Sequence, residues 1–463
     1  MFNDVRYGVG EIHQYISNAT QRDPHLGIDD AIGDEAKAKK LLAEAQANLE
    51  LAAVTGYTPE LRRSFITGLS SGGPLLIIYG ILIVAFISMA IAISLSELVS
   101  AIPNAGGQYY WTSKLAPPKY SAFASYMCGA FAWAGAVFTS ASVTVSIATA
   151  LVGMYVLGSG DANTTVETWQ VFITYEIVNV LLVLFNIWEK PLARISQGAL
   201  YISIFSFIVI TITVLAKSSG HYQSARFVFV EFSNGTGWSS SAIAFIVGLI
   251  NPNWSFSCLD AATHLAEETL TPQTDIPKAI IGTVIIGFLT SFSYAISMFF
   301  SMRNLDELLN SNTGVPIMDI FYQALQSKAG AIVLEVLILL TAIGCNIASH
   351  TWQARLCWSF ARDEGLPGSR YWSKVNKRTG VPVAAHLMSC ACFPPVMPVT
   401  AGNMNYVSVV IGVFGIYCVI YWFARGKYRF KTASDREKDI DGLTHQLSNQ
   451  VNQLEAIVSQ GKE

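Results

Sequence analysis

Long runs without a charged side chain dominate this sequence. Six runs lack Asp, Glu, Lys and Arg altogether, at 64–96, 120–160, 195–216, 232–259, 279–302 and 379–424. A helix needs about 20 apolar residues to cross the hydrocarbon core of a bilayer, and every run is long enough. Only 13% of the 463 residues are charged, against about 25% in soluble domains. The sequence therefore predicts an all-α, polytopic membrane protein.

Two further runs, at 168–188 and 329–354, contain one acid each, Glu176 and Glu335. The run at 379–424 is long enough for a helical hairpin, which brings the predicted total to about nine spans. The predicted permease domain covers 66–425, between a cytoplasmic-type polar tail at 1–65 and a polar tail at 426–463. Its spans are expected at about 74–97, 121–150, 168–188, 196–217, 239–265, 279–302, 329–353, 380–399 and 403–424.

Lysine and arginine in short loops predict the orientation, since cytoplasmic loops carry an excess of both. The 355–378 loop holds six of them, and four more follow the last span at 425–431, so both segments are predicted to lie inside. Arg62 and Arg63 conflict with this scheme, because counting spans backwards places them outside. Residues 65–71 make only about 10 Å of helix, which is too short to cross. The sequence therefore predicts that a span is missing after the arginine pair.

One span contains a break that points to a binding site. Asn251-Pro252-Asn253 interrupts it, and proline removes a backbone donor and clashes with the preceding turn. Irregular backbone at membrane depth is tolerated where it lines a cavity or is buried in protein. Its freed N–H and C=O groups can then bind a polar solute. We predict a substrate site that includes Asn251, with a simple proline kink as the alternative.

Aromatic and acidic residues near the break add candidates. Trp254 and Phe256 flank it, and Trp133 lies in another span; aromatic faces hold a quaternary ammonium, which has no N–H to donate. Asp260 lies at the end of the broken span and Glu335 inside a different one, and an ionisable residue within a span is a functional candidate by default. We predict that both acids serve coupling. The alternatives are core or lipid packing for the aromatic residues, a headgroup position for Asp260 and a structural hydrogen bond for Glu335.

Nothing in the sequence indicates catalysis or a bound cofactor. A His-Glu-x-x-His helix and a phosphate loop are absent, and His264, His350 and His386 lie in separate segments without the spacing of metal ligands. The seven cysteines are scattered and predict neither a metal site nor a disulfide framework. The chain is predicted to be no enzyme and to hold neither a cofactor nor a metal.

Residues 96–110 (SELVSAIPNAGGQYY), 260–280 (DAATHLAEETLTPQTDIPKAI) and 358–367 (WSFARDEGLP) form three specific motifs. Together they resemble the fungal amino acid/choline transporter family, with choline permeases closest and GABA permeases next. This family belongs to the amino acid–polyamine–organocation superfamily. The resemblance implies twelve spans, the first ten forming two inverted five-helix repeats whose first and sixth helices unwind around the substrate.

The sixth span of this superfamily often reads Trp-Ser-Phe-x-Gly-x-acid, and the matching positions here run from Trp254 to Asp260. The resemblance implies a substrate site that includes Ser255, Ser257 and Cys258. It also implies that Trp254 is a gate over the substrate and that Asp260 couples transport to protons. Cys258 stands where the pattern has glycine, so the backbone geometry of the break does not carry over from the family.

Two junctions depart from the family pattern. Residues 51–65 normally lead into the first span, but here they join a segment that normally follows it. Near 390–393 the start of a ninth span similarly runs into the loop before a twelfth. By this comparison about three of twelve spans are missing, and the loss of the first removes half of the substrate cage. We therefore hypothesise that transport is impaired.

The sequence as a whole predicts a secondary active, proton-coupled permease of the plasma membrane that carries a small amine solute such as choline. GABA or another amino acid is the alternative substrate. A non-transporting membrane sensor or regulatory partner is the alternative function. The expected partners are the solute, a proton as the coupling ion and the lipid bilayer, and no nucleic acid is expected.

Overall fold

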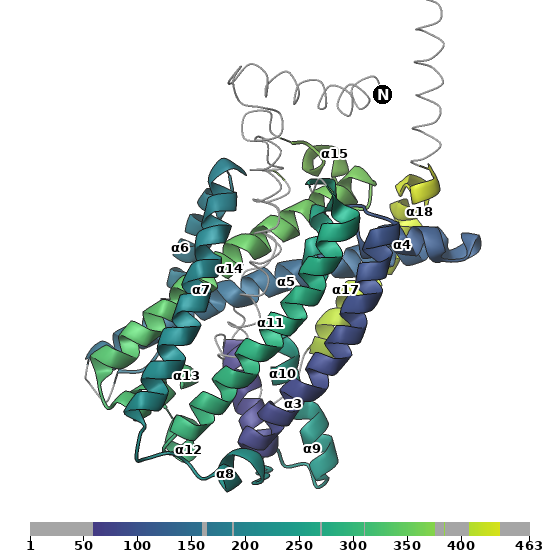
Figure 1. Ribbon diagram of the computed structural model, residues 1–463. Helices are drawn as coiled ribbons and strands as arrows, with labels where there is room; N and C mark the ends of the chain where they lie inside the picture. Colours follow the sequence, from purple (N-terminus) through teal and green to yellow (C-terminus); the bar gives the residue numbers. More distant parts are fainter. Residues whose placement is uncertain are drawn as a thin grey trace, which may run out of the picture.

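A computed structural model describes residues 59–159, 164–187, 189–268, 271–309, 311–375, 384 and 407–435. The predicted span at 380–399 lies outside these residues, except for its residue 384, and so do most of both predicted tails. Across the described segments the chain forms helices and no strands. Six helices are long and apolar enough to cross a membrane, and they form the bundle in Figure 1.

The long helices are α3 (Pro59–Ala101), α5 (Pro118–Ser159), α6 (Thr168–Asn186), α7 (Glu189–Lys217), α11 (Pro272–Ser301) and α14 (Lys328–Arg362). The short ones are α4 (Gln108–Leu115), α8 (Ala225–Phe229), α9 (Ser241–Gly248), α10 (Ile250–Trp254), α12 (Leu305–Leu309), α13 (Pro316–Leu325), α15 (Ser369–Trp372), α17 (Val407–Tyr421) and α18 (Lys427–Arg429). A 3₁₀ helix, η1 (Ala261–Glu268), and a π-helix, η2 (Trp422–Gly426), complete the described elements.

Several helices are longer than the spans expected from the charge-free runs. Helix α5 has 42 residues and α14 has 35, although about 20 suffice to cross a bilayer at right angles. Both run obliquely across the other helices in Figure 1, and a tilted helix needs more residues to cross. Local signals determine where α14 starts: the Ser327 side chain accepts the backbone N–H of Gly330 at 3.2 Å, as N-cap residues do.

Helix α3 contains a sharp reversal of the chain. Gly73 adopts φ 70° and ψ −160°, a conformation that glycine tolerates best, and Pro74 follows it. A Cβ atom built on Gly68 would lie 3.4 Å from Ile77 Cγ1, so the segments before and after Gly73 lie side by side. Figure 1 shows the purple start of α3 running down to this turn before the rest of the helix rises. We call residues 59–72 the half-helix, because they make only about 20 Å of helix.

The half-helix includes the backbone of Arg62 and Arg63 and begins inside the predicted N-terminal tail. Its side chains Phe65 and Leu69 are 4% and 1% exposed and belong to the main apolar cluster. The short stretch after the arginine pair is therefore part of a packed helix. Its turn lies at the lower end of the bundle in Figure 1, near α8 and α9.

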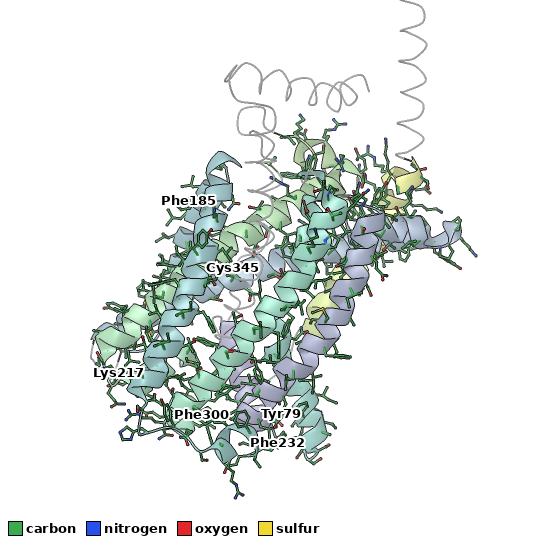
Figure 2. The ribbon with its side chains drawn as sticks, in the orientation of Figure 1. Tyr79, Phe185, Lys217, Phe232, Phe300 and Cys345 are labelled. Atoms are coloured by element: carbon green, nitrogen blue, oxygen red, sulfur yellow. The ribbon has the colours of Figure 1, made fainter. Side chains whose placement is uncertain are left out.

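Hydrogen bonds between distant segments define the two ends of the bundle. At the upper end of Figure 1, the hydroxyl of Tyr109 lies 2.8 Å from Ser359 Oγ and donates to Asp363 Oδ2 at 2.9 Å. At the lower end, the backbone N–H of Gln223 donates to Phe300 O at 2.9 Å, and Figure 2 shows Phe300 there with Phe232 and Lys217. The described parts of the segments predicted to face inward, 355–378 and 425–431, lie at the upper end.

The chain after the last described span forms a strap across the upper end. Phe430 packs its ring against Tyr126 and Phe360, with centroids 5.8 and 6.0 Å away. Lys431 donates its backbone N–H to Asp363 O at 3.1 Å, and Ala433 donates to Ser113 Oγ at 3.2 Å. We call residues 430–433 the C-terminal strap. It joins the ends of α4, α5 and α14.

Large apolar side chains cover the outside of the helices. Four different helices expose such side chains: Phe86 of α3 is 80% exposed, Ile212 of α7 62%, Ile246 of α9 67% and Leu289 of α11 58%. A soluble monomer rarely exposes contiguous apolar surface on this scale. Hydrocarbon around the bundle accounts for it.

Candidate functional site

The broken span changes from α-helix to tighter turns at Trp254. After α10 the backbone N–H groups of Ser255, Phe256 and Ser257 donate to carbonyls three residues earlier, at 3.1 to 3.3 Å. These bonds are those of a 3₁₀ helix and are poorer than those of an α-helix. The same pattern resumes where the Ala261 N–H donates to Cys258 O at 3.0 Å, at the start of η1. The break predicted from Asn251-Pro252-Asn253 is therefore present, although it lies just after the proline. It extends over residues 255–260.

Cys258 adopts a left-handed backbone conformation, with φ 65°. Among L-residues this conformation costs about 1–2 kcal/mol, whereas glycine adopts it freely. The left-handed backbone explains why the superfamily pattern has glycine at this position. In this chain Cys258 adopts a backbone conformation that glycine would adopt without strain.

Replacing Cys258 by glycine is expected to raise the free energy of unfolding by about 1 kcal/mol, because the left-handed backbone is no longer strained. The same change at Cys345, in the middle of α14, should destabilise the protein, since glycine costs about 1 kcal/mol in a helix interior. Thermal unfolding of the detergent-solubilised variants, followed by size-exclusion chromatography, measures both shifts. A melting temperature of Cys258→Gly below that of the wild type would contradict the strain argument.

Buried polar groups gather where the break meets the half-helix. Asn251 and Ser255 are each 1% exposed, and neither Asn251 Nδ2 nor Ser255 Oγ has a hydrogen-bond partner in the described structure. Ser71, on the half-helix, is fully buried and its Oγ is likewise without a partner. A Cβ on Gly68 would lie 3.2 Å from Asn251 Cβ, which shows how closely the two segments pack. Most buried polar groups in proteins are hydrogen-bonded, so these three side chains are free to contact a polar ligand.

The predicted aromatic residues lie on two sides of the break. Phe256 is 4% exposed and, with the half-buried Trp254, belongs to the main apolar cluster that also holds the half-helix. Trp133 of α5 belongs to a second cluster, which includes Trp352 of α14 and contacts Cys258. The structure thus gathers Trp133 and Cys258 in one cluster and Trp254 and Phe256 in the other. Ser257, half-buried, donates its hydroxyl to Asn253 O at 3.2 Å.

Asp260 faces a histidine that sequence reasoning did not select. His264 Nε2 lies 3.7 Å from Asp260 Oδ2, and the two side chains are 0% and 18% exposed. His264 Nδ1 lies 2.7 Å from the carbonyl oxygen of Ala105, in the loop before α4. The only sequence signal for this arrangement is the spacing of four residues between the acid and the histidine.

Glu335 lies far from Asp260. It is 0% exposed on α14, close enough to Tyr294 of α11 for an electrostatic interaction. The Trp352 ring, on the same helix, lies beside the His264 ring with centroids 6.4 Å apart. Seventeen residues of α14 separate Glu335 from Trp352, which corresponds to about 25 Å along the helix axis. The two predicted coupling acids therefore do not form one site.

A buried polar seam between α5 and α14 was not predicted. Ser140 donates to Gln353, and the hydroxyl of Thr144 lies 2.7 Å from the side-chain amide of Asn346. All four residues are at most 3% exposed. Amides and hydroxyls inside an apolar run carry no charge, so a search for ionisable groups passes over them. The seam links α5 to α14 by hydrogen bonds between their side chains.

Residues 68–72 spell Gly-Leu-Ser-Ser-Gly, the spacing of a hydrolase nucleophile motif, and sequence reasoning overlooked it. That motif requires a strained turn from a strand into a helix, which exposes the serine. Here it lies within the half-helix, and Ser70 uses its carbonyl oxygen to accept the N–H of Gly235 at 2.6 Å. The structural context of a nucleophile is missing in this segment.

Comparison with known proteins identifies the family. The pattern of the Amino acid permease family matches residues 52–391. The chain is 49% identical over 450 residues to a choline transporter of Saccharomyces cerevisiae, covering 81% of this chain and 80% of the relative. It is 31% identical to a 7-keto 8-aminopelargonic acid transporter of the same yeast, covering 84% of this chain and 77% of the relative. A putative amino acid/polyamine transporter of Macrophomina phaseolina is 36% identical, covering 75% and 76%.

The alignment with the yeast choline transporter also bears on the missing spans. It covers 81% of 463 residues, which is about 375, so about 75 of its 450 positions have no residue in this chain. This number corresponds to roughly three spans of about 25 residues each.

The relatives are named as transporters or permeases, which favours transport over catalysis, and they imply small-molecule substrates. The family match covers more than half of the chain, and six helices are apolar and long enough to cross a bilayer. The chain therefore belongs to the amino acid permease family and is a multi-pass membrane transporter.

Proposed function

We propose that this protein carries choline or a closely related small amine across the plasma membrane by proton-coupled secondary transport. The observation that carries the proposal is the break at residues 255–260. It combines irregular backbone with the buried, unpartnered polar groups of Asn251, Ser255 and Ser71. Discontinuous helices of this kind bind substrates and ions in transporters.

The aromatic residues favour a quaternary amine. Choline offers a positive charge without an N–H, so side-chain oxygens gain little from it, whereas aromatic faces attract it. Trp254 and Phe256 supply such faces at the break, and Trp133 and Trp352 supply them on its other side. The name of the yeast choline transporter, at 49% identity, supports the same substrate.

An amino acid is the alternative substrate, and a specific relative favours it. The second yeast protein is named for 7-keto 8-aminopelargonic acid, which carries a primary amine and a carboxylate. Asn251 and Ser255 can hydrogen-bond to such groups, in a way that choline's ammonium cannot use. GABA has the same two functional groups.

In the alignment with the yeast choline transporter, about 75 positions have no residue in this chain. This difference favours a third candidate function, a membrane sensor or regulatory partner that does not transport. The half-helix supplies one wall of the site. It is too short for a full first span of the family, and the described residues contain no second half to complete that span. A substrate cage open on one side predicts weak binding or impaired transport.

Uptake of labelled choline and labelled GABA, by a permease-deficient host that expresses this chain, tests the proposal. We expect saturable choline uptake that other quaternary amines inhibit and that primary-amine acids leave unchanged. Saturable GABA uptake that choline does not inhibit would favour the amino acid alternative. Surface-localised protein without uptake of either compound would contradict the transport proposal and favour the sensor.

A further inference from the structure

The tautomer of His264 follows from its contact with Ala105. The side chain is buried, and Nδ1 lies 2.7 Å from the carbonyl oxygen of Ala105. A carbonyl oxygen only accepts hydrogen bonds, so Nδ1 must carry the hydrogen. In the neutral imidazole the other nitrogen, Nε2, is then an acceptor.

That assignment places two acceptors opposite one another. Nε2 of a neutral His264 and an ionised Asp260 Oδ2, 3.7 Å apart, would each present a lone pair to the other. The contact becomes favourable when one proton joins the pair. The proton resides either on Nε2, which makes an imidazolium facing a carboxylate, or on Oδ2, which makes a neutral carboxyl group facing a neutral imidazole. The proton belongs to the pair rather than to one residue.

We infer that His264 and Asp260 together form the site that binds the coupling proton. The inference rests on the proposed proton-coupled transport and deepens it, because it assigns the proton to a pair of atoms, Nε2 and Oδ2. Asp260 ends the irregular segment that begins at Ser255, and its carbonyl accepts the Thr263 N–H at 2.9 Å and the Thr263 hydroxyl at 2.6 Å. The pair therefore lies at the end of the break, next to the first turn of η1.

Neighbouring groups pack closely around His264 and shield it from solvent. A Cβ on Gly107, which has φ 53°, would lie 2.8 Å from Thr263 Oγ1 and 3.0 Å from His264 Cε1. The loop before α4 thus closes tightly over the histidine. The Trp352 ring lies beside the imidazole, with the two centroids 6.4 Å apart and the planes tilted by 31°. Asp260, at 18% exposure, is the member of the pair that solvent can reach.

The elements around the pair carry other titratable groups. From α5, Cys128 interacts electrostatically with Asp260. On α11, Asp275 accepts a hydrogen bond from Thr271 Oγ1 at 2.6 Å, and Lys278 is exposed. Helix α14 contributes two further groups, the buried His350 and Arg355. Within the described part of the chain, His264 and Asp260 form the histidine–carboxylate contact at the break.

The test compares three substitutions in the full-length protein, reconstituted into vesicles and supplied with labelled choline, or with labelled GABA if choline is not carried. His264→Asn keeps an amide N–H where Nδ1 donates to Ala105 but has no Nε2. His264→Gln places an amide near Nε2 instead. His221→Asn, at an exposed position in the loop after α7, is the matched control.

Accumulation driven by a pH gradient should fall at least tenfold in His264→Asn and His264→Gln, and its dependence on external pH should flatten. Counterflow, which exchanges solute without net proton movement, should fall less than threefold. His221→Asn should behave as the wild type. Accumulation and a pH profile like those of the wild type in His264→Asn would overturn the inference.

A second measurement decides the proton site independently of transport. Protonation of His264 should change the tryptophan fluorescence of the purified protein through Trp352, giving a step when the pH is varied. The step should vanish in His264→Asn and in Trp352→Phe. A step that persists in His264→Asn, or no step in the wild type, would overturn the inference. Absence of all uptake and counterflow with an intact step would count against the proposed function alone.

Discussion

Gly80→Val is expected to destabilise the protein and to lower the yield of correctly folded, monodisperse material. A Cβ at this position would lie 2.6 Å from Pro252 Cγ and 3.1 Å from Leu249 Cδ2. The proline ring is rigid and belongs to the broken span, so α3 would have to move away from the site. Overpacking a tight contact costs typically about 1–3 kcal/mol, and two extra methyl groups on the Cβ place the cost at the upper end.

Fluorescence-detected size-exclusion chromatography of the solubilised variant measures the loss of monodisperse protein. Gly282→Val is the matched control, because a Cβ on Gly282, in α11, meets no atom within 4 Å. The control should retain the wild-type elution profile and stability. Equal yields of monodisperse Gly80→Val and Gly282→Val would show that α3 does not pack against Pro252 in the way described.

Replacing Asp260 by asparagine is expected to eliminate solute accumulation while leaving the fold intact. The amide has nearly the shape of the carboxylate and still faces His264, but it cannot take up or release a proton. Coupling free energies between two sites are typically 1–3 kcal/mol, which corresponds to a loss of about 5- to 150-fold. Uptake of labelled solute against its gradient, at several external pH values, measures the change.

Glu335→Gln provides the comparison between the two predicted coupling acids. Glu335 lies about 25 Å from Trp352 along α14, so it is remote from the His264 and Asp260 pair. Its amide variant should lower accumulation less than Asp260→Asn does. A larger loss in Glu335→Gln than in Asp260→Asn would move the coupling site to the contact with Tyr294.

The helices and the break were predictable because each depends on local sequence. Charge-free runs mark the long helices, and Asn251-Pro252-Asn253 marks the irregular segment within a few residues. The tilt of α5 and α14 was not predictable, since it depends on packing between helices rather than on composition. Only the structure shows that the chain turns back on itself at Gly73.

Long-range contacts account for most of what the sequence did not reveal about the site. His264 and Ala105 are 159 positions apart, and Thr144 and Asn346 are 202 apart. No local pattern pairs residues at such separations. Cys258 is different: the superfamily pattern pointed to glycine at this position, and the left-handed backbone observed there supplies the reason.

The C-terminal strap has a consequence for the order in which the protein assembles. Its hydrogen bond from Ala433 to Ser113 joins residues 320 positions apart. At a synthesis rate of about 5–20 residues per second, roughly 15–60 s pass between the emergence of α4 and that of the strap. Until the strap emerges, the ring of Tyr126 and, once α14 has been made, that of Phe360 lack the Phe430 ring that packs on them in the finished protein. The upper end of the bundle therefore closes last, after every other described helix has been made.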